Sequence, residues 1–187
     1  MDRGSSLMRL FFALVFSPET GQQIQKVQDN LRQYAPQARF PDLETFHITL
    51  AFLGEVPPQK LDQAKTALNG LNPLPMTLCF GRMGKFSQRE GDVWWLGVDP
   101  DPALFSLQEE LVKGLRAQGF SLEKRNFKPH VTLARKVLFQ DQIPRKEALL
   151  PQPIYAPCGR VSLMSSQLRP QGPLYKELAG KSPGLSP

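Results

Sequence analysis

Short apolar runs alternate along this chain with stretches in which apolar residues recur every three or four positions. Runs of about four to eight apolar residues are typical of buried strands, and the longer spacing is typical of helices that bury one face. Between the strands, residues 85–92 are predicted to form a polar loop, and residues from Gly180 onward a disordered tail. The strand pattern occurs at residues 9–16, 46–53, 76–80, 93–98, 129–134, 160–168 and 174–178.

The helical stretches each begin at a proline, which suits the first turn of a helix. Ser17 precedes Pro18 and Asp101 precedes Pro102, so both are predicted N-caps. Because helices and strands alternate, the fold class is α/β or α+β. The apolar positions of the predicted helices are Ile24, Val27, Leu31 and Tyr34; Leu61, Ala64 and Leu68; and Leu104, Leu107, Leu111 and Leu115.

One short pattern occurs twice and contains both histidines of the chain. Residues 47–50 read His-Ile-Thr-Leu, and residues 130–133 read His-Val-Thr-Leu. Each copy follows a phenylalanine within three residues and precedes an alanine, and nearly half the chain separates the two copies. A repeat at this spacing predicts two similar lobes related by a pseudo-twofold axis.

The two copies carry a set of groups suited to acid–base chemistry. Side chains alternate faces along a strand, so His47 points to the same side as Thr49, and His130 to the same side as Thr132. The residues between them then anchor each strand in the core. If the two strands lie side by side, one imidazole can act as general base and the other as general acid. The threonine hydroxyls can donate hydrogen bonds to phosphoryl oxygens, so the pattern predicts attack at phosphorus.

Other interpretations of the histidines are weaker. A single histidine on an apolar strand is more often structural, and a two-residue match arises easily by chance, but the duplication favours a shared site. Zinc usually takes three or four protein ligands, and no cysteine, histidine or acidic cluster adjoins either motif. No motif for a serine or cysteine nucleophile is present.

Charge changes this picture because it is concentrated around the second motif. The chain of 187 residues has 23 Lys and Arg against 17 Asp and Glu, a net charge of +6. The whole surplus lies between Lys113 and Lys136, where Glu123 is the only acidic residue. A basic surplus predicts an anionic partner, although a modest one can also serve solubility alone.

Cysteine usage and hydropathy argue against other classes. Cys79 and Cys158 are isolated, so neither a disulfide framework nor a cysteine-based metal site is expected. No apolar run approaches the ~20 residues that a membrane-spanning helix needs. The first 16 residues have no small-residue cleavage site and are predicted to be a frayed tail and a strand rather than a signal peptide. We expect a cytoplasmic protein.

Together the two motifs resemble the signature of the 2H phosphoesterases. The longer strings look like the bacterial RNA 2′,3′-cyclic phosphodiesterase branch of that superfamily, also called 2′-5′ RNA ligase. The resemblance runs from about Met8 to Leu178. The strings are R-L-F-F-A near the start, residues 46–54 (FHITLAFLG), 93–97 (VWWLG), 127–135 (FKPHVTLAR) and 163–175 (LMSSQLRPQGPLY).

The resemblance implies an α+β fold and a metal-independent reaction. It implies one bilobal domain over residues 8–180, with antiparallel sheets flanking a central cleft and flexible tails at 1–7 and 181–187. His47 would protonate the leaving 3′ oxygen of a terminal 2′,3′-cyclic phosphate of RNA, and His130 would activate water, leaving a 2′-phosphate. Thr49 and Thr132 would hold the phosphate oxygens. The reverse reaction, with a 5′-hydroxyl strand, would form a 2′-5′ linkage without ATP. No cofactor is expected, and a monomer is.

The resemblance also suggests residues that bind substrate. Arg135 is a candidate for the phosphate, but strand parity places it opposite His130, so it must lie at a strand end or a bulge. Lys128 and Arg125 are candidates for following an RNA backbone, and the alternative for each cation is a solvated surface charge. Candidates for stacking on bases, for which core packing is the alternative, are Phe86, Trp94, Trp95, Phe127 and Tyr175.

The same chemistry would also suit other substrates. Small cyclic nucleotides, a cyclic ADP-ribose phosphate or 2′-5′ oligonucleotides are alternatives within the phosphodiesterase reading. An RNA-binding module without catalysis is an alternative of a different class, although both histidines and both threonines are present.

Overall fold

The computed structural model describes residues 6–73, 75–157 and 159–184. Its strands are β1 (Met8–Val15), β2 (His47–Val56), β3 (Thr77–Phe80), β4 (Arg82–Phe86), β5 (Asp92–Gly97), β6 (His130–Val137), β7 (Ile154–Pro157), β8 (Arg160–Gln167) and β9 (Leu174–Lys181). Its helices are α1 (Pro18–Tyr34), α2 (Leu61–Gly70), α3 (Pro102–Ala117) and α4 (Lys146–Leu149), with 3₁₀ turns η1 (Leu43–Thr45) and η2 (Pro58–Lys60).

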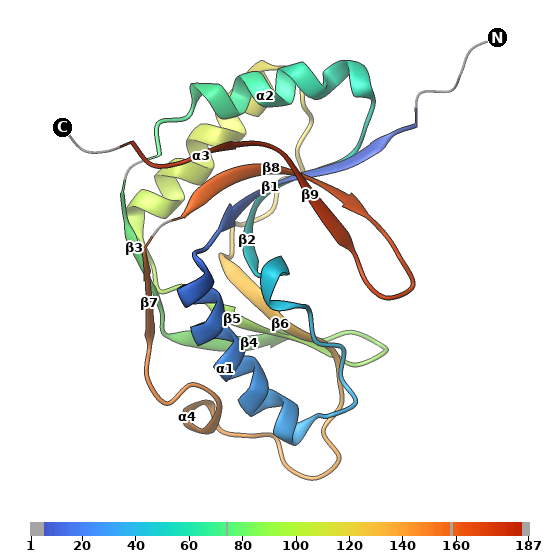
Figure 1. The fold of residues 1–187 in the computed structure, drawn as a ribbon, viewed down its shortest axis with the longest axis vertical. Helices are drawn as coiled ribbons and strands as arrows, with labels where there is room; N and C mark the ends of the chain where they lie inside the picture. The colour runs from blue at the N-terminus through green and yellow to red at the C-terminus, as the bar shows by residue number, and fades with distance from the viewer. Residues whose placement is uncertain (1–5, 74, 158, 185–187) are drawn as a thin grey trace.

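The strands form three antiparallel sheets, and the two motif strands lie in different sheets. One sheet has the order β2-β1-β8-β9, the second β4-β5-β6, and the third pairs β3 with β7 (Figure 1). Helices α2 and α3 pack together against the four-stranded sheet, whereas α1 contacts β6, β7 and α4. The expected α+β class is therefore confirmed, with one copy of the motif in each of the two larger sheets.

Caps and apolar stripes explain why the two long helices form where they do. The Ser17 hydroxyl accepts a hydrogen bond from the Thr20 amide at 3.3 Å, and the Asp101 carboxylate accepts one from the Leu104 amide at 2.9 Å. Both N-caps are thus as predicted. The predicted leucine stripe of α3 is completely or almost completely buried. In β1, the alternate residues Leu10, Phe12 and Leu14 are fully buried and leave the other face of the sheet for different work.

The sequence pattern missed strand β4, part of which lies in the predicted loop over residues 85–92. The segment Arg82–Phe86 is short and polar and has no apolar run that could identify it. Its partner β5 forms because Gly84 leaves room for the Trp95 ring. A Cβ added at Gly84 would lie 2.3 Å from a ring carbon of Trp95, so any larger residue would collide with it. The loop itself is confined to the residues between β4 and β5.

Two predicted strand ends are also wrong. β2 continues to Val56 because Gly54, at φ 71°, accommodates a bulge instead of ending the strand. β9 includes Gly180 and Lys181, which were expected in a disordered tail. The Lys181 ammonium donates hydrogen bonds to the carbonyls of Asn69, at 2.7 Å, and Leu71, which holds this end against the segment after α2. Strand β7 and helix α4 lie in the stretch expected to be a proline-rich connection.

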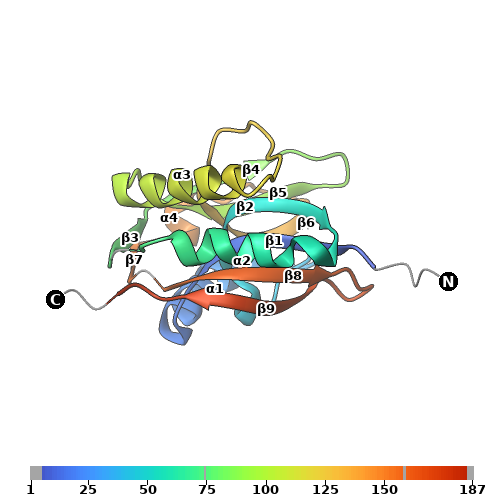
Figure 2. The same cartoon turned by 90° about the horizontal axis from the view of Figure 1, so that it is seen from above.

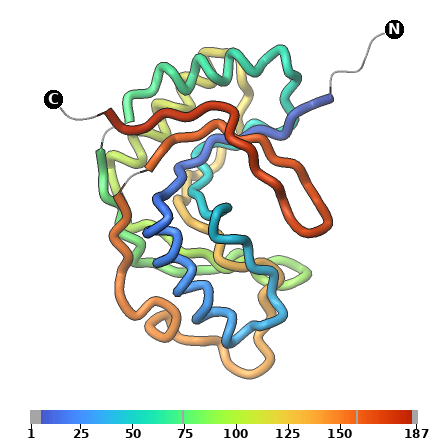
Figure 3. The backbone as a smooth tube through the Cα atoms, in the orientation of Figure 1, coloured from blue at the N-terminus to red at the C-terminus, as the bar shows by residue number. Residues whose placement is uncertain are grey.

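The hairpins β4–β5 and β8–β9 both extend toward the same side of the molecule, where β1 also begins (Figures 2 and 3). No helix in the described part of the chain is long and apolar enough to cross a bilayer. Cys79 is a free cysteine in β3, and the prediction for Cys158 lies outside the described residues.

Candidate active site

The two histidines occupy equivalent places in neighbouring strands. His47 is the first residue of β2 and His130 the first of β6, and these two strands are in contact. Each imidazole places its Nδ1 within hydrogen-bond distance of the carbonyl two residues earlier, 2.7 Å from Thr45 O and 2.6 Å from Lys128 O. A carbonyl can only accept, so both Nδ1 atoms carry the proton and both Nε2 atoms are left for other partners.

Burial and nearby positive charge lower the pKa of both imidazoles. For His47 the main cause is burial, partly opposed by the Thr45 carbonyl, and the charges of His130 and Arg135 add to the lowering of the pKa. For His130 burial again lowers the pKa most, the Lys128 carbonyl opposes it, and Arg135 adds to it. Because the charge of His130 acts on His47 and that of Arg135 on both, the three side chains share one electrostatic environment.

The predicted alternation of side chains holds in both motif strands. The Thr49 hydroxyl lies 3.2 Å from His47 Nε2, so these two residues share a face. Thr132 is half-buried two residues after His130, on the equivalent face of β6. The intervening residues are buried in the core, as predicted: Ile48, Leu50, Val131 and Leu133.

A bulge in β6 brings Arg135 to the histidine face, as strand parity required. Trp95 pairs with Thr132 and Trp94 with Ala134, so Leu133 is an extra residue in β6. The shift reverses the parity beyond Leu133, and Arg135 then points to the side of Thr132 rather than opposite it. Arg135 also pairs by backbone hydrogen bonds of 2.8 Å in both directions with Arg39, in the segment that leads to β2.

Aromatic side chains surround His47. Its ring centroid lies 5.2 Å from that of Phe11 in β1 and 5.4 Å from that of Tyr175 in β9, which it meets edge-on. Burial raises the pKa of Tyr175, and the charges of Arg135 and Arg9 act in the opposite direction. Tyr175, a predicted stacking residue, therefore lies directly beside His47.

A second aromatic group borders His130 from the three-stranded sheet. The ring centroids of Phe86 and Trp95 lie 5.2 Å and 5.9 Å from that of His130. Trp94 points the other way into the core and contacts Phe139, as alternation requires. Phe127 packs on Phe105 at 5.4 Å. Of the predicted stacking candidates, Trp94 and Phe127 thus serve packing, whereas Phe86, Trp95 and Tyr175 line the histidines.

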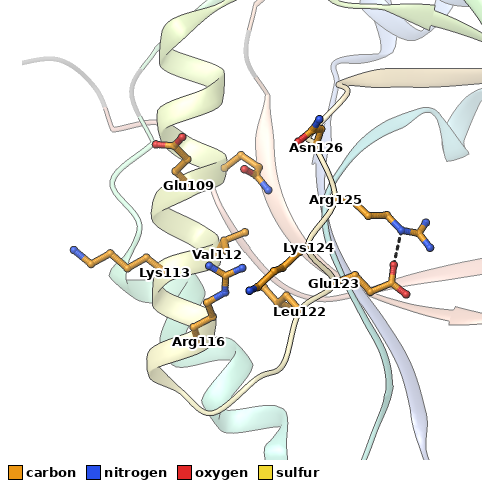
Figure 4. A pocket seen from close by; sticks show the side chains of 10 residues that line it. Glu109, Val112, Lys113, Arg116, Leu122, Glu123, Lys124, Arg125 and Asn126 are labelled. Carbon is orange, nitrogen blue, oxygen red and sulfur yellow. Dashed lines mark ion pairs between the residues drawn. The ribbon is translucent and has the colours of Figure 1, made fainter.

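The basic segment before β6 is only partly gathered at the histidines. Lys128 contributes its carbonyl to His130, and its side chain is exposed. Arg125 forms an ion pair of 2.6 Å with Glu123 on the outer side of its loop. A cavity of about 500 Å³ lies between α3 and this loop, and neither motif lines it. Figure 4 shows Arg116 and Lys124 extending toward one another from its two walls, with both acidic side chains turned away from them.

Two cations at the site were missed by sequence reasoning, together with Phe11 and Gln28. Arg9 and Phe11 lie on the histidine face of β1, because Val15 of that strand pairs with His47 and Ala13 with Thr49. The apolar run around them was assigned to the core as a whole, although its alternate positions carry the signal. Arg39 could not be found from its sequence neighbours, because its contact with Arg135 is long-range.

Comparison with known proteins adds a family to this geometry. A family model described as the 2′-5′ RNA ligase superfamily matches residues 13–169. The chain belongs to the 2′-5′ RNA ligase superfamily. The resemblance in the motif strings is thereby confirmed at the level of the family.

Two relatives of this superfamily member share one name. A Thermotoga maritima protein named RNA 2′,3′-cyclic phosphodiesterase is 33% identical over 175 residues, covering 91% of this chain and 93% of that protein. A Geobacillus stearothermophilus protein of the same name is 33% identical over 129 residues, covering 67% of this chain but 41% of that protein. This chain therefore spans less than half the length of the Geobacillus relative.

The fold agrees with that of solved members of the superfamily. Escherichia coli LigT, solved in complex with 3′-AMP, superposes with a TM-score of 0.76 over 96% of this chain and 99% of that chain, at 24% identity. This likeness concerns the fold and confirms the predicted 2H phosphoesterase architecture. Within the described residues, no three His, Cys, Asp or Glu side chains gather as a metal site would require.

Proposed function

We propose that the protein hydrolyses terminal 2′,3′-cyclic phosphates of RNA to 2′-phosphates. The observation that carries the proposal is the pair of equivalent imidazoles, each held by a carbonyl at Nδ1 and each leaving Nε2 for a reacting group. The names of the Thermotoga and Geobacillus relatives support the same activity. Both relatives are similar enough in sequence for the motif strands to correspond.

The reaction requires one imidazole to accept a proton and the other to donate one. Nε2 of His130 takes a proton from water as the water oxygen attacks phosphorus. The bond between phosphorus and the 3′ oxygen breaks, and Nε2 of His47 gives its proton to that oxygen. The products are a 2′-phosphate and a 3′-hydroxyl. Exchange of one proton with solvent through each ring restores the starting state.

Three further side chains would hold the phosphate during this step. Thr49 and Thr132 lie on the faces of the two histidines and can donate hydrogen bonds to the non-bridging oxygens. Arg135 supplies a positive charge where charge builds up on those oxygens, and such preorganised donors are a large part of catalysis. The same charge lowers the pKa of both imidazoles in the free enzyme. An anionic phosphate would compensate it.

The RNA chain adjoining the phosphate would be held by aromatic and basic groups. Tyr175 and Phe86 border the two histidines and are suited to contacts with the ribose or base. Lys128 and Arg125 remain our candidates for the RNA backbone, with Arg116 and Lys124 beside them. A 5′-hydroxyl end in place of water would give 2′-5′ ligation by the same groups. The cytoplasmic location and the monomeric state stay predictions.

The deciding experiment uses an oligoribonucleotide that ends in a 2′,3′-cyclic phosphate, in the presence of excess chelator. Chromatography against synthetic standards identifies the position of the product phosphate, and a 2′-phosphate is expected. A 3′-phosphate would contradict the assignment of the leaving group. Tight binding without turnover would indicate an RNA-binding module. A much higher kcat/KM for cyclic mononucleotides or for 2′-5′ oligonucleotides would reassign the substrate within the same chemistry.

A further inference from the structure

One large aromatic ring is exposed on the same sheet face as the first motif. Phe52 in β2 leaves 49% of its surface accessible. In the register of β2 with β1, Thr49 pairs with Ala13 and Phe52 pairs with Phe11, and paired residues of antiparallel strands point to the same side. Because the bulge at Leu50 lies between Thr49 and Phe52, Phe52 shares the face of Thr49 despite their odd separation.

A cation lies over this ring. The guanidinium carbon of Arg9 is 4.8 Å from the ring centroid of Phe52, within the range of a cation–π contact. Glu55 lies opposite Arg9 in the register, yet among the described residues no ion pair joins the two. Arg9 thus keeps its charge beside an exposed aromatic face instead of neutralising it on the neighbouring carboxylate.

Phe52 and Arg9 are connected to the histidines by a continuous strip of side chains. Phe11 lies between them and contacts Tyr175 at 5.1 Å and His47 at 5.2 Å. The charge of Arg9 acts on Tyr175, as does that of Arg135. The strip therefore leads from the proposed phosphate position, past Tyr175 and Phe11, to the exposed ring.

We propose that Phe52 and Arg9 form a platform for a nucleobase of the RNA end. A base can stack on the exposed ring whatever its identity, because every base has a π-face, and the guanidinium can contact the base or an adjoining phosphate. The proposal rests on the proposed function, because it concerns the same RNA end. The alternative is that Phe52 is an isolated exposed aromatic residue that only packs on the arginine stem, as single surface apolar residues often do.

The test changes the ring and the base together. Phe52→Ala and Phe52→Trp are compared with the wild-type protein on three oligoribonucleotides of equal length, all ending in a 2′,3′-cyclic phosphate. One is complete, and in the others the last or the second-last base is replaced by hydrogen. Stacking predicts that Phe52→Ala raises KM for the complete RNA roughly tenfold and that Phe52→Trp restores it. On the RNA that lacks the stacked base, wild type and Phe52→Ala should be equal.

A matched control removes an exposed aromatic ring elsewhere. Tyr155 is 64% exposed on β7, in the separate two-stranded sheet, and Tyr155→Ala should leave KM unchanged for all three RNAs. Arg9→Gln should raise KM in the same base-dependent way as Phe52→Ala. Equal losses on complete and base-free RNA, or no loss at all, would overturn the platform, because a structural role is blind to the base.

The outcome is separable from that of the proposed function. If the wild-type protein turned over none of the three RNAs, the proposed function would fail. Fluorescence anisotropy with the same labelled RNAs would then still report binding. A loss of affinity in Phe52→Ala for complete RNA only would keep the platform, and affinities equal to wild type on every RNA would reject it.

Discussion

The buried side-chain amide of Gln28 donates a hydrogen bond of 3.0 Å to the carbonyl of Leu133, 105 residues further along the chain. Leu133 is the extra residue of the β6 bulge, which turns Arg135 to the histidine face. The same amide donates a second hydrogen bond, of 2.9 Å, to the carbonyl of Pro41, in the segment that leads to His47. One side chain on α1 thus joins the two segments that carry the motifs.

Replacing Gln28 should therefore affect both stability and substrate binding. Gln28→Met keeps a similar volume but leaves two carbonyls without this donor, and each such loss costs about 1–3 kcal/mol when the group is buried. Urea unfolding should show a lower free energy of unfolding than in wild type. Steady-state kinetics should show a raised KM, because the bulge no longer fixes Arg135. Gln22→Met, at an exposed position of the same helix, is the control. Unchanged stability in Gln28→Met would refute this role.

The proton donor and the proton acceptor can be told apart by the leaving group. His47→Ala and His130→Ala should each lower kcat on an RNA 2′,3′-cyclic phosphate on the order of 10²-fold or more. A phosphodiester with an activated leaving group, such as p-nitrophenolate, departs without protonation. On that substrate His47→Ala should regain most of its activity, whereas His130→Ala should not. The opposite result would exchange the two roles, and two unaffected variants would reject both.

The pH dependence follows from the lowered pKa values of the two imidazoles. The reactive form has His47 protonated and His130 neutral, so activity falls at low pH when His130 gains a proton and at high pH when His47 loses its own. Because burial and Arg135 lower the pKa of both rings below the ordinary value of 6.5, the bell of kcat/KM should have its maximum below pH 6.5. An anionic phosphate raises both pKa values, so the kcat profile should be displaced to higher pH.

Profiles on both substrates check this assignment. A kcat/KM that is flat between about pH 5 and 8, or highest above pH 7, would contradict it. On the activated substrate, where no proton needs to be donated, the fall at high pH should disappear and the fall at low pH should remain. That difference separates titration of the catalytic pair from unfolding, which would affect both substrates alike.

Local patterns predicted the parts of the site that depend on nearby residues. Strand alternation placed His47 with Thr49 and His130 with Thr132, and parity required a bulge before Arg135. The contacts between distant segments were out of reach, because they depend on register and on packing. Phe52 belongs to the histidine face only because of the Leu50 bulge, which no periodicity signals. Strand β4 likewise exists through a glycine that accommodates a tryptophan ring.

The proposed role of Arg135 can be measured against its neighbour. Arg135→Gln removes a positive charge from the histidine face, whereas Lys136→Gln removes one that is paired with Glu90. Arg135→Gln should raise KM and lower kcat by about tenfold or more, because it loses a charge-assisted contact to the phosphate. It should also displace the kcat/KM maximum toward higher pH, since Arg135 no longer lowers the pKa of the imidazoles. An Arg135→Gln profile that coincides with that of Lys136→Gln would remove Arg135 from the site.

The last prediction concerns the facing cations of the cavity beside α3. Like charges that point toward one another without an acid between them favour an anion in that space, and RNA phosphates are the anions that the proposed substrate brings. If Arg116 and Lys124 each contact one phosphate, the double variant Arg116→Gln/Lys124→Gln should bind a long oligoribonucleotide more weakly and a cyclic mononucleotide as well as wild type does.

Salt dependence provides the quantitative measurement for this pair. The slope of log K against log salt changes by about 0.7 for each phosphate contact with a single strand, so the double variant should have a slope shallower by about 1.4. Arg145→Gln/Lys146→Gln removes the same charges from exposed positions at α4 and serves as the matched control. If both double variants flattened the slope equally, the effect would come from net charge alone. If only Arg116→Gln/Lys124→Gln did so, the RNA would pass between α3 and the loop that leads to His130.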